Sequence, residues 1–259
     1  MVQRVSLERD GAIATVTLNR PAKLNAISLD MWDWLGEVFV ELDRDPDLRC
    51  VILRGAGARA FSVGADIGEF EEQRSTAAKA KRYGARTHGA MDKIVACRHP
   101  VVARIDGLCV GGGLELAVAA DLRVCSDRAR FGIPIKRLGL VVAYAELAPL
   151  VQLVGPANAK EILLEGRIFD AARAHAMGLV NRVVADRDLD REIRETAERI
   201  ALGAPLVARW HKAFVRRLMS PKPLTRAERD ESYACFATED FATGYRAFLA
   251  KETPSFKGR

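Results

Sequence analysis

The sequence predicts an α/β fold whose strands are mostly parallel. Short apolar segments typical of buried strands alternate with segments whose apolar residues recur at helical spacing, as far as about residue 184. An antiparallel hairpin opens this pattern, and only helical spacing follows Gly203-Ala204-Pro205. We therefore expect one catalytic unit, divided into a core over residues 1–202 and a helical region over residues 203–259.

The first elements are a hairpin and a helix. Residues 2–8 and 13–18 alternate apolar and polar side chains around Asp10-Gly11, a strong turn signal. Apolar residues at helical spacing then follow Ser28, a favourable N-cap residue, and Asp45-Pro46 ends that helix.

The middle of the chain repeats the alternation. Residues 50–53 read as a buried strand, a glycine-rich loop covers 55–64, and a helical region with a break near Gly84 extends to about residue 97. Residues 101–105 are the next strand.

A second strand-to-helix unit begins at Gly111-Gly112-Gly113, which opens a helix to about residue 120 before a strand over 122–125. An apolar stretch to residue 154 precedes a helix that starts at Pro156. A helix over 170–177, closed by Gly178, and a strand over 179–184 complete the core.

Bulk composition fits an ordinary globular protein. The 259 residues are 49% hydrophobic and 29% charged, which excludes a disordered chain. The first ten residues carry charges throughout, and the most apolar stretch, 101–122, is interrupted by charges and glycines. These features indicate neither a signal peptide nor a membrane span, so we expect a cytosolic (cytoplasmic) or organelle-matrix location.

Charge and cysteines narrow the choice of ligand. Five scattered cysteines without a Cys-x-x-Cys pair predict free buried thiols, not a zinc site or a disulfide framework. Of the net charge of +6, most lies beyond residue 205, where 11 Lys or Arg face 6 Asp or Glu. That excess suits a polyanionic ligand or, equally, a solvated helical surface; a nucleic acid is less favoured because no recognised binding motif is present.

Two glycine-containing loops are the first candidate for chemistry. The three glycines at 111–113 leave backbone N–H groups bare at a helix N-terminus, although such a turn can also serve tight packing alone. The loop over residues 60–67 also follows a buried strand. Two such loops could aim two N–H donors at one carbonyl oxygen, as an oxyanion hole requires.

Other interpretations of these loops and of the histidines are weaker. Residues 55–60 match a relaxed dinucleotide fingerprint, but no amphipathic helix follows. Residues 60–64 resemble a nucleophile elbow, but the only histidines well downstream, His175 and His211, have no motif around them. His88 and His99 show no metal-ligand spacing, so we expect them at the surface or at helix ends.

Four segments together carry a family resemblance. They are Asn-Arg-Pro and Asn-Ala at 19–26, Phe-Ser-Val-Gly-Ala-Asp-Ile at 61–67, the segment 106–121, and residues 169–181, with agreement at 236–240 and 256–259. Their order and spacing resemble the crotonase, or enoyl-CoA hydratase/isomerase, superfamily along nearly the whole chain. The resemblance implies a spiral of stacked ββα units with a helical C-terminal trimerisation region, as a homotrimer or dimer of trimers.

The resemblance also implies a ligand, an acyl-coenzyme A bound in a bent form, and no cofactor or metal beyond it. The backbone N–H groups of Ala65 and Gly112 correspond to the family's oxyanion hole. Residues expected to contact coenzyme A are Lys23, Leu24, Ala65, Asp66, Ile67 and Lys251, the last reaching its phosphates within the chain or across a subunit boundary.

The carboxylates depart from the hydratase pattern. Of the two glutamates that hydratases use, the first is present as Glu115, but the second position holds Ile135, which cannot accept a proton. Nearby, Tyr144 and Glu146 replace a glycine-rich segment and can exchange protons. We therefore predict Glu115 as general acid or base, helped by Glu146 or Tyr144.

Three functions remain open from the sequence. The first is an enoyl-CoA hydratase-like lyase that stabilises an enolate thioester. The second is a single-carboxylate isomerase, decarboxylase or thioester hydrolase, and the third is a non-catalytic acyl-CoA-binding protein. We expect the pocket wall to include residues 79–88 and 140–146.

Overall fold

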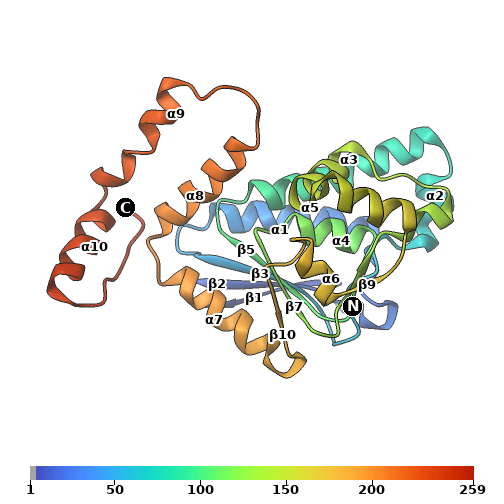
Figure 1. Cartoon of the computed structure of the whole chain (residues 1–259), viewed down its shortest axis with the longest axis horizontal. Helices are drawn as coiled ribbons and strands as arrows, with labels where there is room; N and C mark the ends of the chain where they lie inside the picture. Colours follow the sequence, from blue (N-terminus) through green and yellow to red (C-terminus); the bar gives the residue numbers. More distant parts are fainter. Residues whose placement is uncertain (1–3) are drawn as a thin grey trace.

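A computed structural model describes residues 4–259 and contains two sheets (Figure 1). The larger sheet has the strand order β1-β2-β3-β5-β7-β10, and the smaller has the order β4-β6-β8-β9. The larger sheet's strands are β1 Val5–Asp10, β2 Ile13–Leu18, β3 Cys50–Gly55, β5 Val101–Ile105, β7 Leu122–Ser126 and β10 Arg182–Val184. The smaller sheet's strands are β4 Ala60–Ser62, β6 Leu108–Val110, β8 Arg130–Gly132 and β9 Phe169–Asp170.

The predicted pairing of the strands is confirmed. β1 and β2 form an antiparallel hairpin that pairs Val5 with Leu18, and Gly11 in its turn has a φ of 56°. All other neighbours in the larger sheet are parallel, as are β4-β6 and β6-β8. Residues 2 and 3 of the predicted first strand lie outside the described residues.

The strands of the smaller sheet were not predicted as separate elements. β4, β6, β8 and β9 have two or three residues each, too few to show a period of two. β4, β6 and β8 follow closely on strands of the larger sheet, so the sequence reads as one loop where the chain turns into a second sheet, and β9 follows α5.

Ten helices accompany the sheets in the described part of the chain. They are α1 Leu29–Arg44, α2 Phe70–Arg74, α3 Ala77–Ala96, α4 Gly112–Val118, α5 Tyr144–Glu165, α6 Ala171–Ala176, α7 Leu189–Ala201, α8 Pro205–Leu218, α9 Arg226–Glu231 and α10 Glu239–Ala250. In Figure 1, α1, α3, α4 and α5 lie on one side of the larger sheet and α7 on the other. Trp32, Phe39, Phe61 and Phe131 are the largest side chains of the buried core.

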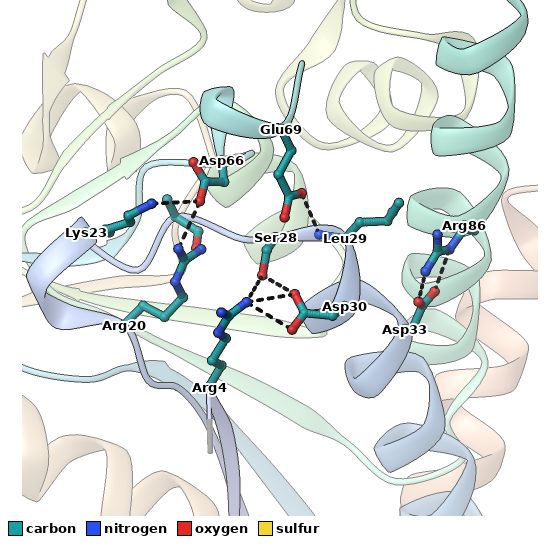
Figure 2. Close-up of polar contacts among 11 residues, drawn as sticks. Arg4, Arg20, Lys23, Ser28, Leu29, Asp30, Asp33, Asp66, Glu69 and Arg86 are labelled. Carbon is teal, nitrogen blue, oxygen red and sulfur yellow. Dashed lines mark hydrogen bonds and ion pairs between the residues drawn. The ribbon is translucent and has the colours of Figure 1, made fainter. Parts of the chain in front are cut away.

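Two helix boundaries differ in detail from the prediction. Ser28 holds the N-cap position of α1, but its hydroxyl bonds Asp30, and the carboxylate of Glu69 accepts the N–H of Leu29 instead (Figure 2). The predicted break at Gly84 is wrong. The interruption falls before Thr76, whose hydroxyl caps α3, and Gly84 lies inside that helix because a single glycine weakens a helix without ending it.

The segment before the last strand contains a kinked helix. α5 begins at Tyr144, earlier than the predicted start at Pro156, and Gly155 interrupts its helical backbone with a φ of 74° and a ψ of 162°. Pro156 therefore starts the second half, as its fixed φ and missing N–H favour. The last strand is shorter than predicted because residues 179–181 precede the ladder.

The helices beyond Gly203 extend away from the sheets (Figure 1). Lys212 of α8 ties this region to the core through an ion pair with Asp121 at 2.7 Å, and Arg209 donates to the carbonyl of Pro46. Several apolar side chains remain exposed here: Val215, Leu218, Met219, Tyr233, Phe236, Phe248 and Leu249. No helix within residues 4–259 is long and apolar enough to cross a membrane.

Candidate active site

A cavity of about 890 Å³ lies between α3, the two glycine loops and the segment that leads into α5. Its wall includes most residues of the predicted segments 79–88 and 140–146, but neither Lys79 nor Tyr144. Ala65, Gly112, Glu115, Glu146 and Ile67 also line it. The cavity therefore gathers side chains and backbone from segments far apart in the sequence.

The two glycine loops touch at the cavity floor. A Cβ atom on Gly64 would lie 2.7 Å from the backbone nitrogen of Gly112, and Gly64 has a φ of 87°, so only glycine fits. From the other side, a Cβ on Gly112 would lie 3.5 Å from the nitrogen of Ala65. The N–H groups predicted to act together are thus neighbours.

Both N–H groups are left without a protein acceptor. The N–H of Ile27 donates to the carbonyl of Gly64, and the carbonyl of Ile27 accepts the N–H of Asp66. Ala65 lies between Gly64 and Asp66, and its N–H points away from these two bonds. Gly112 is the first residue of α4, where an N–H has no acceptor in its own helix. Within residues 4–259 neither N–H donates to another group, which leaves both available to a ligand oxygen.

Glu115 stands beside this pair. A Cβ on Gly112 would lie 3.6 Å from Oε2 of Glu115, one turn further along α4. Burial raises the pKa of Glu115 to about 8, and the nearby Glu146 carboxylate adds to the rise, while Arg74 opposes it. At neutral pH Glu115 is therefore mostly protonated and can donate a proton.

Glu146 also faces the cavity and is held at both oxygens. Its Oε1 lies 2.9 Å from Nε2 of His88, and its Oε2 accepts the N–H of Ala143 at 2.9 Å. The side chain is 16% exposed. These two contacts, one at each carboxylate oxygen, fix the orientation of the side chain. A freely solvated glutamate would have no such fixed orientation.

Tyr144 is not brought to the other predicted residues. It is 90% exposed and is not among the residues lining the cavity. It begins α5, two positions before Glu146, and residues two apart on a helix do not share a face. Ile135, at the position of the missing glutamate, does line the cavity.

The surface location predicted for two histidines is wrong. His88 lies inside α3 and lines the cavity against Glu146. His99 is 0% exposed, and neither ring nitrogen has a hydrogen-bond partner. Spacing in the sequence could not reveal either position, because the partners and the cover come from distant segments.

Two of the residues predicted to contact coenzyme A, Lys23 and Asp66, form a polar cluster with Arg20 (Figure 2). Oδ2 of Asp66 lies 2.9 Å from Nη2 of Arg20 and 3.2 Å from Nζ of Lys23. The bond from Arg20 is the main reason why the pKa of Asp66 is lowered, helped by Lys23 and the N–H of Gly68. Leu24 follows in the left-handed region with a φ of 51°, and Ile67 is exposed at the cavity.

Lys251 is not near these residues within one chain. It follows α10 in a left-handed conformation, and Figure 1 shows α10 at the opposite end of the molecule from α2 and α3. In the described part of the chain, no three His, Cys, Asp or Glu side chains gather in a way that could hold a metal ion.

Two further residues of the cavity were missed by the sequence analysis. Arg74 ends α2 and Trp32 lies in α1, and both line the cavity. The only signal for Arg74 was its spacing of four from Phe70, which places an arginine beside an aromatic ring on a helix. In the sequence, Trp32 has the pattern of a core residue of the first helix, so nothing marked it as part of a cavity.

Comparisons with known proteins identify the family of the chain. The family model for enoyl-CoA hydratase/isomerase matches residues 8–259. The chain is similar to a probable enoyl-CoA hydratase of Mycobacterium tuberculosis, 36% identical over 99% of both chains. It is similar to a carnitinyl-CoA dehydratase of Escherichia coli, 35% identical over the full length of both.

Solved structures give the same result. The fold matches an enoyl-CoA hydratase/carnithine racemase from Magnetospirillum magneticum with a TM-score of 0.98 and 50% identity, over 100% of this chain and 97% of that one. An enoyl-CoA hydratase from Bacillus anthracis matches with a TM-score of 0.93 and 28% identity, over 99% of this chain and 100% of that one. The chain has the crotonase fold and belongs to the enoyl-CoA hydratase/isomerase family of enzymes.

Proposed function

We propose that this enzyme is an enoyl-CoA hydratase-like lyase, which adds water to an α,β-unsaturated acyl-coenzyme A or removes it. The observation that carries the proposal is the pair of unpartnered N–H groups at Ala65 and Gly112 next to Glu115. A thioester oxygen placed between the two N–H groups accepts from both. Each such donor lowers the barrier by about 3–4 kcal/mol when the oxygen becomes an enolate oxygen.

Proton transfer is divided between the two glutamates. Glu146, oriented by His88 and the N–H of Ala143, takes a proton from water as its oxygen bonds the β-carbon. The electrons of the double bond move to the thioester oxygen, giving the enolate. Glu115, protonated through its raised pKa, then gives its proton to the α-carbon, so one water has been added.

The catalytic groups reset by passing a proton from Glu146 to Glu115. Both glutamates line the cavity, and the charge of Glu146 raises the pKa of Glu115, which supports a proton transfer between them. In this scheme Glu146 takes the role that Ile135 cannot fill, and the exposed Tyr144 has no part in it.

Assembly, location and ligand contacts complete the proposal. The exposed apolar side chains of α8 to α10 suit an oligomerisation region over residues 203–259, as a homotrimer or dimer of trimers in the cytoplasm. Coenzyme A is the only cofactor-like group. Lys23, Leu24, Asp66 and Ile67 contact it from the same chain, and Lys251 from a neighbouring one.

A second candidate is an isomerase, decarboxylase or thioester hydrolase that uses Glu115 alone. The observation in its favour is Ile135, an apolar side chain at the cavity where a hydratase has its second carboxylate. In this candidate Glu146 is a structural partner of His88.

Turnover of crotonyl-coenzyme A by the purified chain, followed by loss of enoyl absorbance and by mass of the product, tests both candidates. We expect a product heavier by one water, and large losses of kcat for Glu115→Gln and Glu146→Gln. Loss in Glu115→Gln alone would favour the second candidate. Tight thioester binding without any conversion would show a binding protein and contradict both.

A further inference from the structure

We infer that the cavity contains a subsite for a negatively charged group on the acyl chain, formed by the guanidinium of Arg74 and the indole N–H of Trp32. The inference rests on the proposed function and adds the substrate class: enoyl thioesters whose acyl chain carries a carboxylate. Nothing in the oxyanion hole requires such a group, so the two ideas can fail separately.

Arg74 is a positioned cation without a counter-ion. Its guanidinium carbon lies 4.6 Å from the ring centre of Phe70 and 4.9 Å from that of Tyr83. These contacts hold the planar group between two rings, and its Nε is buried with no hydrogen-bond partner. Among residues 4–259 no carboxylate forms an ion pair with it. Arginine in such a position presents free donors in a fixed fork, which suits a carboxylate.

Trp32 supplies a second unused donor in the same cavity. Its side chain is 2% exposed, and among residues 4–259 its Nε1–H makes no hydrogen bond of normal geometry, although it lies close enough to the Tyr83 hydroxyl to oppose the burial that raises the pKa of that group. A buried donor without a partner is rare in proteins, since it has lost its hydrogen bond to water. An anionic oxygen of the ligand would satisfy it together with Arg74.

The acidic side chains around the cavity have other roles. Glu146 is held by His88, and Glu69 accepts the N–H of Leu29. Glu115 is influenced by Arg74 but lies outside ion-pairing distance of it, and it is mostly protonated at neutral pH. The cavity therefore has no internal anion for Arg74.

Two more cations strengthen the positive character of this wall. Lys81 and Arg137 line the cavity as well, and neither has an ion-pair partner within the described residues. A purely hydrocarbon acyl chain would leave the Trp32 donor unsatisfied, whereas Lys81 and Arg137 are exposed to water in either case. A carboxylate on the acyl chain accepts from them.

The phosphates of coenzyme A offer the same oxygen chemistry, but they suit this position less well. Trp32 is almost fully buried, whereas a nucleotide bound across the surface keeps its phosphates near water. The acyl chain is the part of the ligand that enters the cavity beyond the thioester. We therefore assign Arg74 and Trp32 to the acyl chain.

The test compares two thioesters of equal length, trans-2-hexenoyl-coenzyme A and its analogue in which the terminal methyl is a carboxylate. We expect the wild-type enzyme to prefer the carboxylate in kcat/KM by about ten- to a hundredfold, the value of one or two hydrogen bonds to a charged group. Arg74→Met should abolish the preference and Arg74→Lys should restore part of it. Trp32→Phe, which keeps the ring, should reduce the preference to a smaller extent.

Lys79→Met is the matched control, because Lys79 is a cation in the first turn of α3 that contacts Ser75 and the carbonyl of Glu71 and does not line the cavity. It should keep the wild-type preference. Calorimetric binding of both thioesters and of free coenzyme A gives a readout independent of turnover.

Three results would overturn the inference. The wild type could turn over and bind both thioesters equally well, which leaves the proposed function intact. Arg74→Met could slow the turnover of both thioesters equally, which would mean that Arg74 acts on Glu115. It could instead weaken the binding of free coenzyme A, which would mean that Arg74 contacts a phosphate. If the wild type neither binds nor converts any enoyl thioester, the proposed function fails as well.

Discussion

Nε2 of His88 lies 2.9 Å from Oε1 of Glu146, and this contact joins α3 to the first turn of α5 across the cavity. It holds Glu146 at the wall of the cavity that Glu115 and Ile135 also line. In the proposed mechanism this contact supplies a second carboxylate, although Ile135 stands where the family resemblance implies a glutamate.

The His88 contact predicts a positioning effect. His88→Ala should lower kcat by about 10- to 100-fold with little change in KM, because Glu146 loses its orientation while the oxyanion hole stays intact. His88→Gln, which can still donate to Glu146, should recover part of the rate. Steady-state kinetics on crotonyl-coenzyme A measure this, and an unchanged kcat in His88→Ala would show that the contact has no role in turnover.

Close packing of the glycine loops predicts a strong effect at Gly64. Gly64→Ala places a Cβ 2.7 Å from the nitrogen of Gly112 and 3.1 Å from the carbonyl oxygen of Val110. Steric overlap and the left-handed backbone should together cost about 2–5 kcal/mol of unfolding free energy. Urea denaturation measures it.

Gly11→Ala is the control for backbone strain alone. Gly11 has a φ of 56° with no atom within 4 Å of the added Cβ, so the loss should be about 1–2 kcal/mol. Equal losses at the two positions would mean that the loops separate easily.

The raised pKa of Glu115 predicts a pH dependence of kcat. If Glu115 donates a proton to the α-carbon, kcat should fall as the pH rises through about 8, where the acid becomes deprotonated. Rate profiles of the wild type and of Asp10→Asn, a distant exposed carboxylate, should coincide. A kcat that rises through pH 8 would assign Glu115 the role of base.

His99 predicts a loss of stability in acid. Burial, followed by the charges of Arg209 and Arg98, lowers the pKa of His99 to about 4 from 6.5, against the opposing effect of Asp43 and Asp45. The neutral ring's contribution is complete above pH 6.5 and is lost as the pH falls toward 4, about 3 kcal/mol in all. Denaturation at pH 7 and pH 4 measures it.

His99→Leu separates this effect from general acid denaturation. The variant should lose less stability than the wild type over the same pH interval, since leucine takes up no proton. An identical pH dependence in both proteins would rule out His99 as the cause.

Local patterns in the sequence were sufficient for much of the fold. The hairpin around Gly11, the parallel strands and the helix that opens at Gly112 follow from periodicities of two or 3.6 residues and from turn residues, which act over short distances. The glycine loops could be proposed as an oxyanion hole for the same reason, and the family resemblance then assigned Ala65, Gly112 and Glu115 within them.

What the sequence determined by itself was therefore the element order, the family resemblance and the loops that meet at Gly64 and Gly112. Only the tertiary structure decided that Glu146 faces the cavity while Tyr144 is exposed, that His88 holds Glu146, and that Arg74 and Trp32 lie unpaired in the same wall. These relationships depend on packing between segments tens of residues apart, and no short-range pattern encodes the direction in which two such side chains meet.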